Sequence, residues 1–389
     1  MSDTGRSVLS VLGAKGFRVF FLLAGCYAAV VVPAWLLVWT GRLAIRGPLQ
    51  GVAWHAHEMV HGFTVAVVAG FLLAAVSNWT GRETATGRPL LLLAGVWVAA
   101  RIMFFLVPGW LGAAVDLAFL PLVAVAIGRP IVAAKDRRNF AFVVLLAALW
   151  VANGLVYLDV AGWLPGGAVA ANRAAVYLIA VIILVVTGRV VPMFTRNATG
   201  VTSIRNLPRV DVVAVAATAG VALAQAWPNA VVVAALAGVA GVATLVRMGR
   251  WGTRHTLGNP LLWVLHLGHA AVGIGLCLVA LRAIVPTMPV SAPVHAVTVG
   301  GIGLLTIGMM SRVSLGHTGR PIRVGSVMAV AFAAVASAAL LRVVGPWAWP
   351  AHTSETLWMA GIAWAGGFAL FTGAYAPILL APRVDGKPG

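Results

Sequence analysis

The chain has 389 residues, of which 61% are hydrophobic and only 9% are charged. So few polar side chains cannot cover the surface of a water-soluble protein, and the composition therefore excludes that class. The net charge of +18 would suit a nucleic-acid-binding protein, but the basic residues are confined to short loops between apolar runs, as in membrane proteins. We therefore expect a single integral membrane domain over residues 1–389, with membrane lipids and no nucleic acid as partners.

Twelve apolar segments follow one another along the chain. Each is close to the length of about 20 residues that a helix needs to cross a hydrocarbon core about 30 Å thick. The segments lie near residues 17–40, 55–77, 89–107, 113–133, 139–160, 173–191, 209–227, 229–246, 259–283, 291–311, 325–344 and 357–380. The narrowest divisions between them are at Pro108-Gly109 and Pro228-Asn229. The sequence predicts an all-α, polytopic membrane bundle of about twelve transmembrane helices.

The Lys and Arg residues predict how these helices are oriented. Of the 27, 21 lie in the N-terminal segment, the even-numbered loops and the C-terminal tail, when Arg189 is counted with the sixth loop. Cytoplasmic loops of membrane proteins carry the excess of basic residues. Both termini are therefore predicted to be cytoplasmic, and the odd-numbered loops periplasmic.

The segment WHAHEMVHGF, residues 54–63, lies at the predicted periplasmic entry to the second helix. On a helix, His57 and His61 are one turn apart on the same face, whereas His55 is rotated away or lies in the preceding loop. Three imidazoles and the Glu58 carboxylate form a dense set of ligands, and imidazole suits copper, zinc and iron alike. Histidines at a membrane interface can also lie among lipid headgroups, but for a cluster of this density we favour metal ligands.

Two oppositely charged residues fall in the third and fourth predicted helices. Arg101 and Asp116 lie at matching depths on either side of the Pro108-Gly109 turn. They can form an internal ion pair. Alternatively, Arg101 faces an anionic group such as a haem propionate, because a guanidinium pairs well with a carboxylate.

His266 and His269 lie three residues apart inside the ninth segment. Ionisable groups within the membrane are costly and usually line a bundle interior or a cavity, so a functional role is the default expectation. The alternative is a neutral imidazole that forms hydrogen bonds with a neighbouring helix.

His295 follows Pro293 at the start of the tenth segment, close in predicted depth to the second-helix cluster. Two opposed histidines from separate helices could hold a haem iron between them.

The remaining signals are weaker. His317 lies in the predicted cytoplasmic loop SLGHTGRP, residues 314–321, where a loop-fixing role is the commoner one. Cys26 and Cys277 are far apart and have no CxxC spacing. The sequence also contains no GxxxxGK[ST], HExxH, GxSxG or CxxCH. An ATPase, a zinc protease, a serine hydrolase and a c-type cytochrome therefore have no motif in their favour.

In these residues and the segments around them, the chain resembles the NnrS family of bacterial membrane proteins over nearly all its length. The segments that carry the resemblance are FRVFFLLAG (17–25), WHAHEMVHGF (54–63), AGFLLAAVSNWTGR (69–82), VDLAFLPLVA (115–124), RVVPMFTRN (189–197), PLLWVLHLGH (260–269), VHAVTVGGIG (294–303) and MMSRVSLGHTGRP (309–321). The resemblance implies a twelve-helix, multi-pass protein of the bacterial inner membrane. It also implies bound haem, expected to be of type b, bound copper, and a role in denitrification and in relief of nitric oxide stress.

The resemblance also bears on single residues. By position, the polar residues typical of the family would be His55, His57, Glu58, His61, His266, His295 and His317. His269 stands where the family commonly has an aromatic residue, often Tyr, so a ligand role is less secure for His269 than for His266. We expect metal ligands among His55, His57, His61, His266, His269 and His295, with His61, His266, His295 and Arg101 contacting haem. Glu58, Asp116 and His317 would contact the ligating residues and hold them in place without touching the metal.

Three functions fit these expectations. The first is a haem and copper redox protein acting on nitric oxide, which would be an oxidoreductase if it converts nitric oxide catalytically. The sequence does not identify its electron donor or its catalytic residues. The second is a transporter of copper or another small solute, because twelve helices is a common carrier size and the glycine-rich tenth helix could unwind. The third is a sensor or scaffold that holds haem without turnover. We favour the first.

Overall fold

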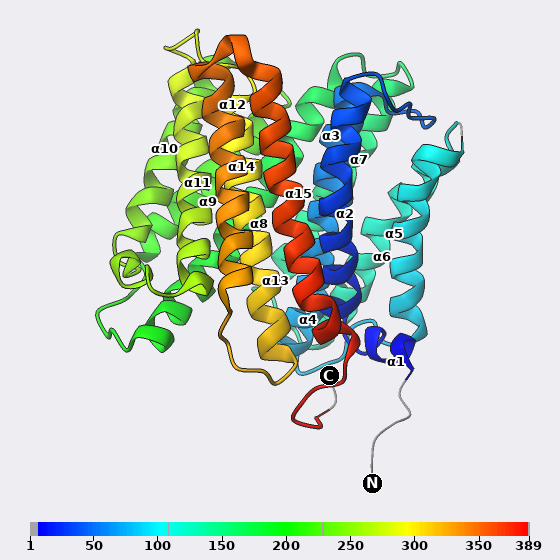
Figure 1. Ribbon diagram of the computed structural model, residues 1–389, viewed down its shortest axis with the longest axis vertical. Helices are drawn as coiled ribbons and strands as arrows, with labels where there is room; N and C mark the ends of the chain where they lie inside the picture. The colour runs from blue at the N-terminus through cyan, green and yellow to red at the C-terminus, as the bar shows by residue number, and fades with distance from the viewer. Residues whose placement is uncertain (1–6, 108, 228, 388–389) are drawn as a thin grey trace. The chain divides into compact units, whose positions relative to one another are not determined.

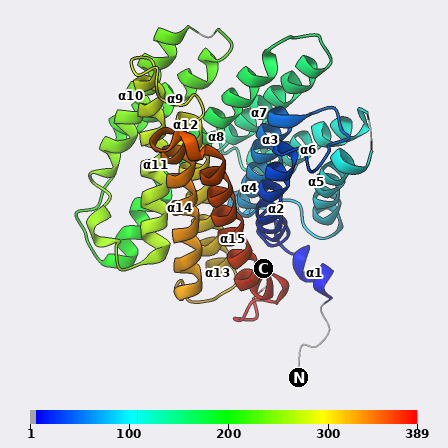
Figure 2. The same ribbon diagram turned by 45° about the horizontal axis from the view of Figure 1, so that its top comes forward.

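Long apolar runs form helices because a backbone surrounded by lipid must satisfy its hydrogen bonds within its own segment. The computed structural model describes residues 7–107, 109–227 and 229–387, and within these ranges it contains helices and no strand (Figures 1 and 2). The expected all-α fold of a polytopic membrane bundle is confirmed. Pro108 and Pro228, where the sequence placed two divisions, lie outside the described residues.

The helices follow the apolar segments closely. In chain order they are α1 (Val8–Leu12), α2 (Gly16–Trp39), α3 (Gly51–His57), η1 (Glu58–Thr64), α4 (Val65–Thr80), α5 (Arg88–Leu106), α6 (Leu111–Ala133), α7 (Phe140–Val160), α8 (Gly167–Thr199), α9 (Pro208–Ala224), α10 (Ala230–Met248), η2 (Thr253–His255), α11 (Pro260–Arg282), α12 (Ala292–His295), η3 (Ala296–Gly303), α13 (Leu304–His317), α14 (Ser326–Ala348), η4 (Pro350–His352) and α15 (Thr353–Leu380). The largest extension is in α8, which continues on both sides of the expected 173–191. A hydropathy window detects only the apolar part of a helix, and this helix continues into polar residues at both ends.

Within the described residues, eleven helical stretches are long and apolar enough to cross a membrane. Two of them are composite, because α3, η1 and α4 join into Gly51–Thr80, and α12, η3 and α13 join into Ala292–His317. The segment expected over 209–227 forms α9, which has 17 residues, two fewer than the shortest of the eleven stretches. The chain is therefore a multi-pass membrane protein by helix length and composition, and the orientation of its termini stays a prediction.

The chain divides into two compact units. Unit 1 takes in the described residues of Met1–Asn172, Met310–Arg323 and Ala369–Gly389, and unit 2 takes in those of Arg173–Met309 and Val324–Phe368. Helices α8, α13 and α15 contribute residues to both units. The single membrane domain expected from the sequence stays a prediction.

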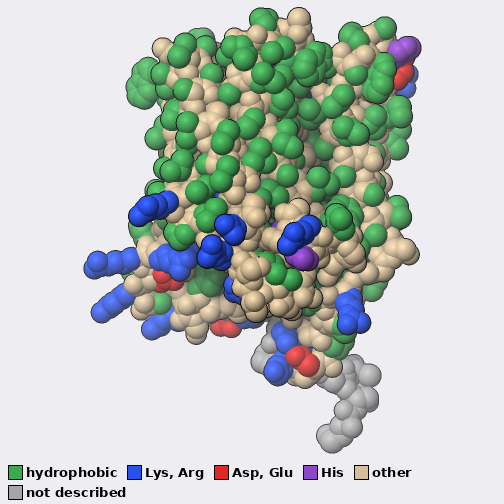
Figure 3. All heavy atoms as spheres, turned by 90° about the vertical axis from the view of Figure 1, so that its left-hand side faces the viewer, with side chains coloured by type: hydrophobic (Ala, Val, Ile, Leu, Met, Phe, Trp, Pro, Cys, Tyr) green, Lys and Arg blue, Asp and Glu red, His purple; other side chains and the backbone are tan. Residues whose placement is uncertain are grey.

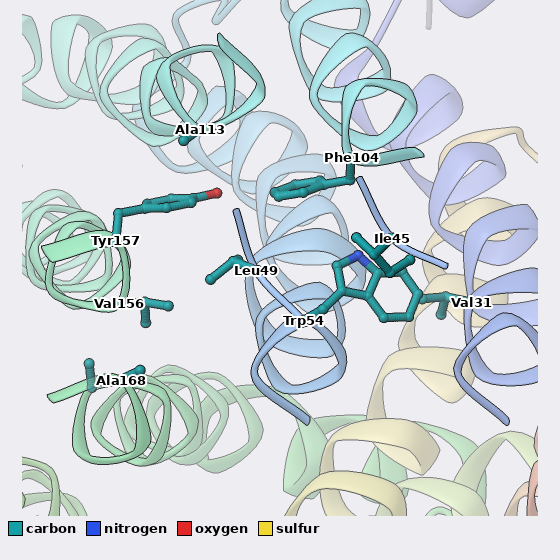
Figure 4. Packing of buried hydrophobic residues seen from close by; sticks show 10 residues of the cluster. Val31, Ile45, Leu49, Trp54, Phe104, Ala113, Val156, Tyr157 and Ala168 are labelled. Atoms are coloured by element: carbon teal, nitrogen blue, oxygen red, sulfur yellow. The ribbon is translucent and has the colours of Figure 1, made fainter. Parts of the chain in front are cut away.

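In unit 1, α4 packs against α2 and α6, and α6 packs in turn against α5 and α7. A buried apolar cluster lies where α2, α3, α5, α6, α7 and the start of α8 meet the loop between α2 and α3 (Figure 4). In Figure 4, Tyr157 from α7 and Phe104 from α5 point toward one another. Trp54 lies close to Ile45, and its side chain is fully buried. This cluster matters for the site because it closes one side of it to water.

In unit 2, α10 packs against both α9 and α11, and α11 packs against η3. Glycines allow these helices to approach closely. A Cβ at Gly241 of α10 would lie 2.6 Å from Cys277 Sγ on α11, and a Cβ at Gly275 would lie 2.8 Å from the backbone nitrogen of Val297. Small residues are the usual means of tight helix packing in membranes, where no hydrophobic force drives helices together and close van der Waals contact must do so.

Two π-helical segments interrupt the long helices. The segment η1 begins directly after His57, and η3 begins directly after His295. A π-helix is rare and is found frequently at functional sites, because the wider turn displaces the following side chains. The glycine-rich tenth segment, which the sequence expected to be able to unwind, therefore keeps a helical backbone in π form over Ala296–Gly303.

Basic side chains are unevenly distributed on the face drawn in Figure 3. Lys and Arg gather toward its lower end, while hydrophobic side chains cover most of the rest. Unit 2 has such residues in the loops that follow α8 and α10, including Arg205, Arg250 and Arg254. This distribution is the one that the positive-inside rule describes.

Candidate functional site

A group of polar side chains is buried within unit 1. Its members come from α2, from the composite helix that contains η1, and from α5, α6 and α7. We call it the charged cluster, and it consists of Tyr27, His57, Glu58, Arg101, Asp116, Asn153 and Tyr157. His57 and Glu58 are fully buried, and Arg101 and Asp116 are 5% and 3% exposed. Charged groups this deep must be paired to be tolerated.

His57 faces hydrogen-bond acceptors on both sides of its ring. Nδ1 lies 2.8 Å from Glu58 Oε1, while Nε2 lies 2.9 Å from Asn153 Oδ1 and 3.2 Å from Asp116 Oδ2. The Asn153 amide nitrogen donates to Asp116 at 2.7 Å, so its oxygen is left to accept from His57. Both ring nitrogens of His57 are therefore donors. A doubly protonated imidazole has no lone pair with which to bind a metal.

Arg101 lies between the two carboxylates of the cluster. Its Nε lies 2.9 Å from Glu58 Oε2, and its Nη2 pairs with Asp116 Oδ1. Of the two alternatives from the sequence, the internal ion pair is the one observed. With His57 as a cation, two positive and two negative groups balance, which keeps the cluster neutral inside the membrane helices.

Two phenols complete the cluster. Tyr27 donates to Glu58 Oε2, and the Tyr157 hydroxyl donates to Asp116 Oδ2 at 3.2 Å. Asn153 and Tyr157 are four residues apart in α7 and share one face. The sequence reasoning missed Tyr27, Asn153 and Tyr157. The signal that could have found them is the occurrence of polar groups inside otherwise apolar membrane helices.

His61 lies one turn beyond His57, within η1, and is only 2% exposed. The two rings are 5.1 Å apart between centroids. Neither Nδ1 nor Nε2 of His61 has a hydrogen-bond partner among the residues that the structure describes. Near it, the Trp97 indole donates to the Gly62 carbonyl at 3.0 Å. A buried polar group without a partner is uncommon in native proteins and calls for an explanation such as an ion or a ligand.

His55 is separate from this pair. It is half-buried and stacks on Trp35 of α2, with 4.6 Å between ring centroids and 17° between ring planes. The rotation away from His57 and His61 that helical geometry predicts is therefore observed. His55 points to a different neighbour from the other two histidines.

Unit 2 contains the second pair, His266 and His269, both on α11 and both buried. Nε2 of His266 lies 2.9 Å from Thr195 Oγ1, and its Nδ1 lies 2.9 Å from Thr253 Oγ1. Nδ1 of His269 lies 3.1 Å from Thr187 Oγ1. The sequence reasoning did not single out these threonines, because Thr is common in membrane helices, where it can bond its own backbone.

The last two predicted histidines have ordinary local contacts. His295, half-buried at the start of η3 in unit 2, has Nδ1 2.7 Å from the Ser291 carbonyl one turn earlier. His317 ends α13 in unit 1, where its ring lies 5.4 Å from that of Phe17. Its carbonyl accepts a hydrogen bond from Arg383 Nη1 at 2.8 Å, so His317 helps to attach the C-terminal tail.

The structure therefore groups the predicted residues by unit. His57, Glu58, His61, Arg101 and Asp116 lie together in unit 1, and His266 and His269 lie together in unit 2. Over residues 7–107, 109–227 and 229–387, no group of three or more His, Cys, Asp or Glu side chains is arranged as a metal site by itself. A metal centre in this protein would thus draw on one or two histidines, completed by other ligands.

Two comparisons with known proteins bear on this arrangement. The family model described as NnrS protein matches residues 11–383, which include both histidine pairs and the charged cluster. A comparison with curated proteins found no match.

Proposed function

Because the chain belongs to the NnrS family, we propose that it is a haem- and copper-containing membrane protein that acts in nitric oxide metabolism or in relief of nitrosative stress. The observation that carries the proposal is His61. Its buried imidazole has two nitrogens without hydrogen-bond partners in the described chain, directly beside a charge-balanced cluster. If the protein turns over, it is an oxidoreductase acting on nitric oxide.

The residues of unit 1 fit haem or copper through a single ligand. A single neutral imidazole is sufficient to hold a haem iron, and imidazole also suits copper. His61 would be that ligand, because either ring nitrogen can present a lone pair. His57 would not, because both of its nitrogens donate to acceptors. Arg101 is occupied by Glu58 and Asp116, so it would act through the cluster and not through a propionate.

When bound, haem iron or copper would supply the site that binds nitric oxide and exchanges an electron with it. The chain's own residues supply the surroundings. His57 holds a proton at Nδ1 against Glu58, one helical turn from His61. Rings of Phe104 and Tyr157, two members of the apolar cluster drawn in Figure 4, lie 5.6 Å and 5.5 Å from the fully buried ring of His57 and would keep water away from it. Nitric oxide is small and apolar, so it can reach such a site through lipid.

The test is the cofactor content of the full-length protein purified in detergent. We expect haem by the pyridine haemochrome assay, copper by mass spectrometry, and a Soret band of the reduced protein that shifts when nitric oxide is added. Folded protein that contains neither haem nor copper would overturn the proposal. Turnover of nitric oxide with an artificial reductant would then separate an enzyme from a sensor or scaffold that only holds haem.

A copper carrier is the second candidate. The observation in its favour is the set of paired charges inside membrane helices, because such groups also mark ion pathways. Copper uptake into proteoliposomes containing the full chain tests it. Uptake that is lost in a Glu58→Gln variant would support a carrier, whereas proteoliposomes no more permeable to copper than protein-free vesicles would exclude one.

A further inference from the structure

The two histidines of α11 differ in how their ring nitrogens are used. Both are buried, with exposures of 2% for His266 and 0% for His269. They lie three residues apart, on neighbouring positions of one helix face. Hydroxyl groups of α8 and of the segment after α10 decide which nitrogen of each ring carries the proton.

His266 is fully occupied by two threonines. The Thr195 hydroxyl donates its hydrogen to the Val191 carbonyl at 2.9 Å, so its oxygen accepts from His266 Nε2. Nδ1 then accepts from the Thr253 hydroxyl at 2.9 Å. A hydroxyl has one hydrogen to donate, so this assignment satisfies every group with a neutral imidazole. His266 therefore has no nitrogen left over.

His269 is occupied on one side only. The Thr187 hydroxyl donates to the Ile183 carbonyl at 2.7 Å, so its oxygen accepts the hydrogen of His269 Nδ1 at 3.1 Å. In a neutral imidazole this places the lone pair on Nε2. Nε2 makes no well-aligned hydrogen bond with the described part of the chain, and the backbone of Thr244 lies within hydrogen-bond range of the ring. A fixed donor bond on one nitrogen and a lone pair on the other is the usual state of a metal-binding histidine.

Two residues that contact His269 also carry unpaired polar atoms. The ring of Trp251 is 4.5 Å from that of His269 between centroids, and Trp251 Nε1 lacks a partner, as does Thr244 Oγ1, within the described residues. The guanidinium carbon of Arg247 lies over the Trp251 ring, 5.2 Å from its centroid. This guanidinium is already paired, because Arg247 Nε lies 2.8 Å from Asp211 Oδ1. Buried polar atoms without partners, on His269 and on two residues in contact with it, call for an explanation such as a bound ion or ligand.

We propose that Nε2 of His269 is the atom through which unit 2 binds a transition metal, as copper or as haem iron, and that Thr187 is the positioning residue that sets its tautomer. The inference rests on the metal content given in the proposed function. It reverses the order expected from the sequence, which favoured His266. Copper and haem iron share the requirement for a neutral imidazole lone pair, and the experiment separates them.

The experiment compares metal content and spectra of purified full-length variants with those of wild type. His269→Gly is expected to lose one centre. Loss of copper with an unchanged Soret band would assign copper, and loss or shift of the Soret band with unchanged copper would assign haem. Added imidazole should restore the lost signal, because it can occupy the space that the side chain vacates. The matched control is His255→Ala, which removes an exposed histidine of the same unit.

Two further variants test the hydrogen-bond argument. Thr187→Val removes the acceptor of the Nδ1 hydrogen and should weaken metal binding about 10- to 100-fold, measured by competition with a copper(I) chelator or by haem loss to apomyoglobin. Thr187→Ser should restore the wild-type value. His266→Ala should retain both metals.

The outcomes separate the two proposals. Wild-type protein with neither metal overturns the proposed function. Wild-type protein with metals, together with a His269→Gly variant that keeps both at wild-type levels and with unchanged spectra, overturns only the assignment to His269. In that case the ring serves to pack against Trp251 and Thr244.

Discussion

The two histidine pairs are built alike and differ in what surrounds them. In each pair, two histidines lie about one turn apart on one helix, and the first is bonded at both ring nitrogens. Among the described residues, both nitrogens of the second histidine in unit 1, and one nitrogen of the second in unit 2, make no hydrogen bond of good geometry. In unit 1 the first histidine, His57, is held by carboxylates and an amide. In unit 2 the first histidine, His266, is held by two threonine hydroxyls. Spacing along the helix therefore does not decide which histidine can bind a metal, but the partners of its ring do.

The difference in partners predicts a difference in stability. Removing one member of a buried ion pair leaves an uncompensated charge, which costs about 3–5 kcal/mol. Removing a neutral hydrogen bond costs about 1 kcal/mol net. Unit 1 should therefore depend on its polar cluster for folding far more than unit 2 depends on its threonines.

The largest expected effect is that of Arg101→Met. This change leaves Glu58 and Asp116 buried without a guanidinium and should lower the free energy of unfolding by about 3–5 kcal/mol. The midpoint of thermal unfolding in detergent, followed by size-exclusion fluorescence, measures it. The control is Arg42→Ala, which removes an exposed arginine of the same unit. If the two variants were equally stable, the cluster would not be a folding determinant. Adding Asp116→Asn to Arg101→Met should recover part of the loss, because the two effects are coupled.

The next effect separates the two histidines of unit 1. His57→Ala removes one of the two cations of the charged cluster and leaves one carboxylate uncompensated, so it should destabilise the protein by about 3 kcal/mol, the lower end of the range for a broken buried pair. His61→Ala breaks no hydrogen bond of its side chain in the described structure, so in protein prepared without haem it should destabilise less than His57→Ala, through lost packing alone, while in protein prepared with haem the spectrum is altered or lost. Unfolding midpoints and reduced optical spectra of both variants give the comparison. His352→Ala, a change at an exposed residue of η4, should leave both unaltered. A His61→Ala spectrum identical to that of wild type would remove His61 as a ligand.

A smaller effect is expected at His266. His266→Ala removes two neutral hydrogen bonds, so the loss should be about 1–2 kcal/mol before any loss of packing. Thr195→Val leaves the Nε2 hydrogen of His266 buried without an acceptor, so it should cost about 1–3 kcal/mol although it removes only one of the two bonds. Chemical or thermal unfolding in detergent measures both. A loss for His266→Ala as large as that for Arg101→Met would show that the neutral and the charged clusters stabilise the fold equally, which would contradict the comparison.

The smallest effect concerns an exposed ion pair outside the membrane helices. Arg383 Nε and Nη2 lie 2.8 and 2.6 Å from the two carboxylate oxygens of Asp385, and the backbone N–H of Val384 donates to the Thr318 carbonyl at 3.2 Å. The Arg383 guanidinium lowers the pKa of Asp385 below its usual range. Because that pKa is lowered on folding, the stabilisation is complete above about pH 4, the ordinary value for Asp, and is lost as the pH falls further.

Hydrogen exchange of the Val384 amide is the measurement. Its protection should fall on acidification in wild type, and Asp385→Asn should show at neutral pH the lower protection that wild type shows in acid. The unfolding midpoint of the whole protein should not change, because exposed pairs contribute little. An Asp385→Asn variant with wild-type protection at neutral pH would rule out the ion pair as the contact that holds the tail.

The sequence was sufficient for much of the fold and for the location of the site. Apolar runs of membrane-spanning length leave the backbone no alternative to helix, so the helical fold followed from composition and hydropathy. The positions of His57 and His61 on one face, and of His55 away from it, followed from helical periodicity. The pairing of Arg101 with Asp116 was one of two alternatives, because their depths could be matched across a short turn.

Only the tertiary structure decided the chemistry of each histidine. The π-helical turns after His57 and His295 have no simple signature in the sequence. The partners Asn153, Thr187 and Thr195 come from helices distant in the chain, and whether a ring nitrogen donates, accepts or remains unpaired depends on those partners. The physical reason is that periodicity specifies the face of a helix on which a side chain lies. The hydrogen-bond partners that fix a tautomer come from neighbouring helices, and packing alone brings them together.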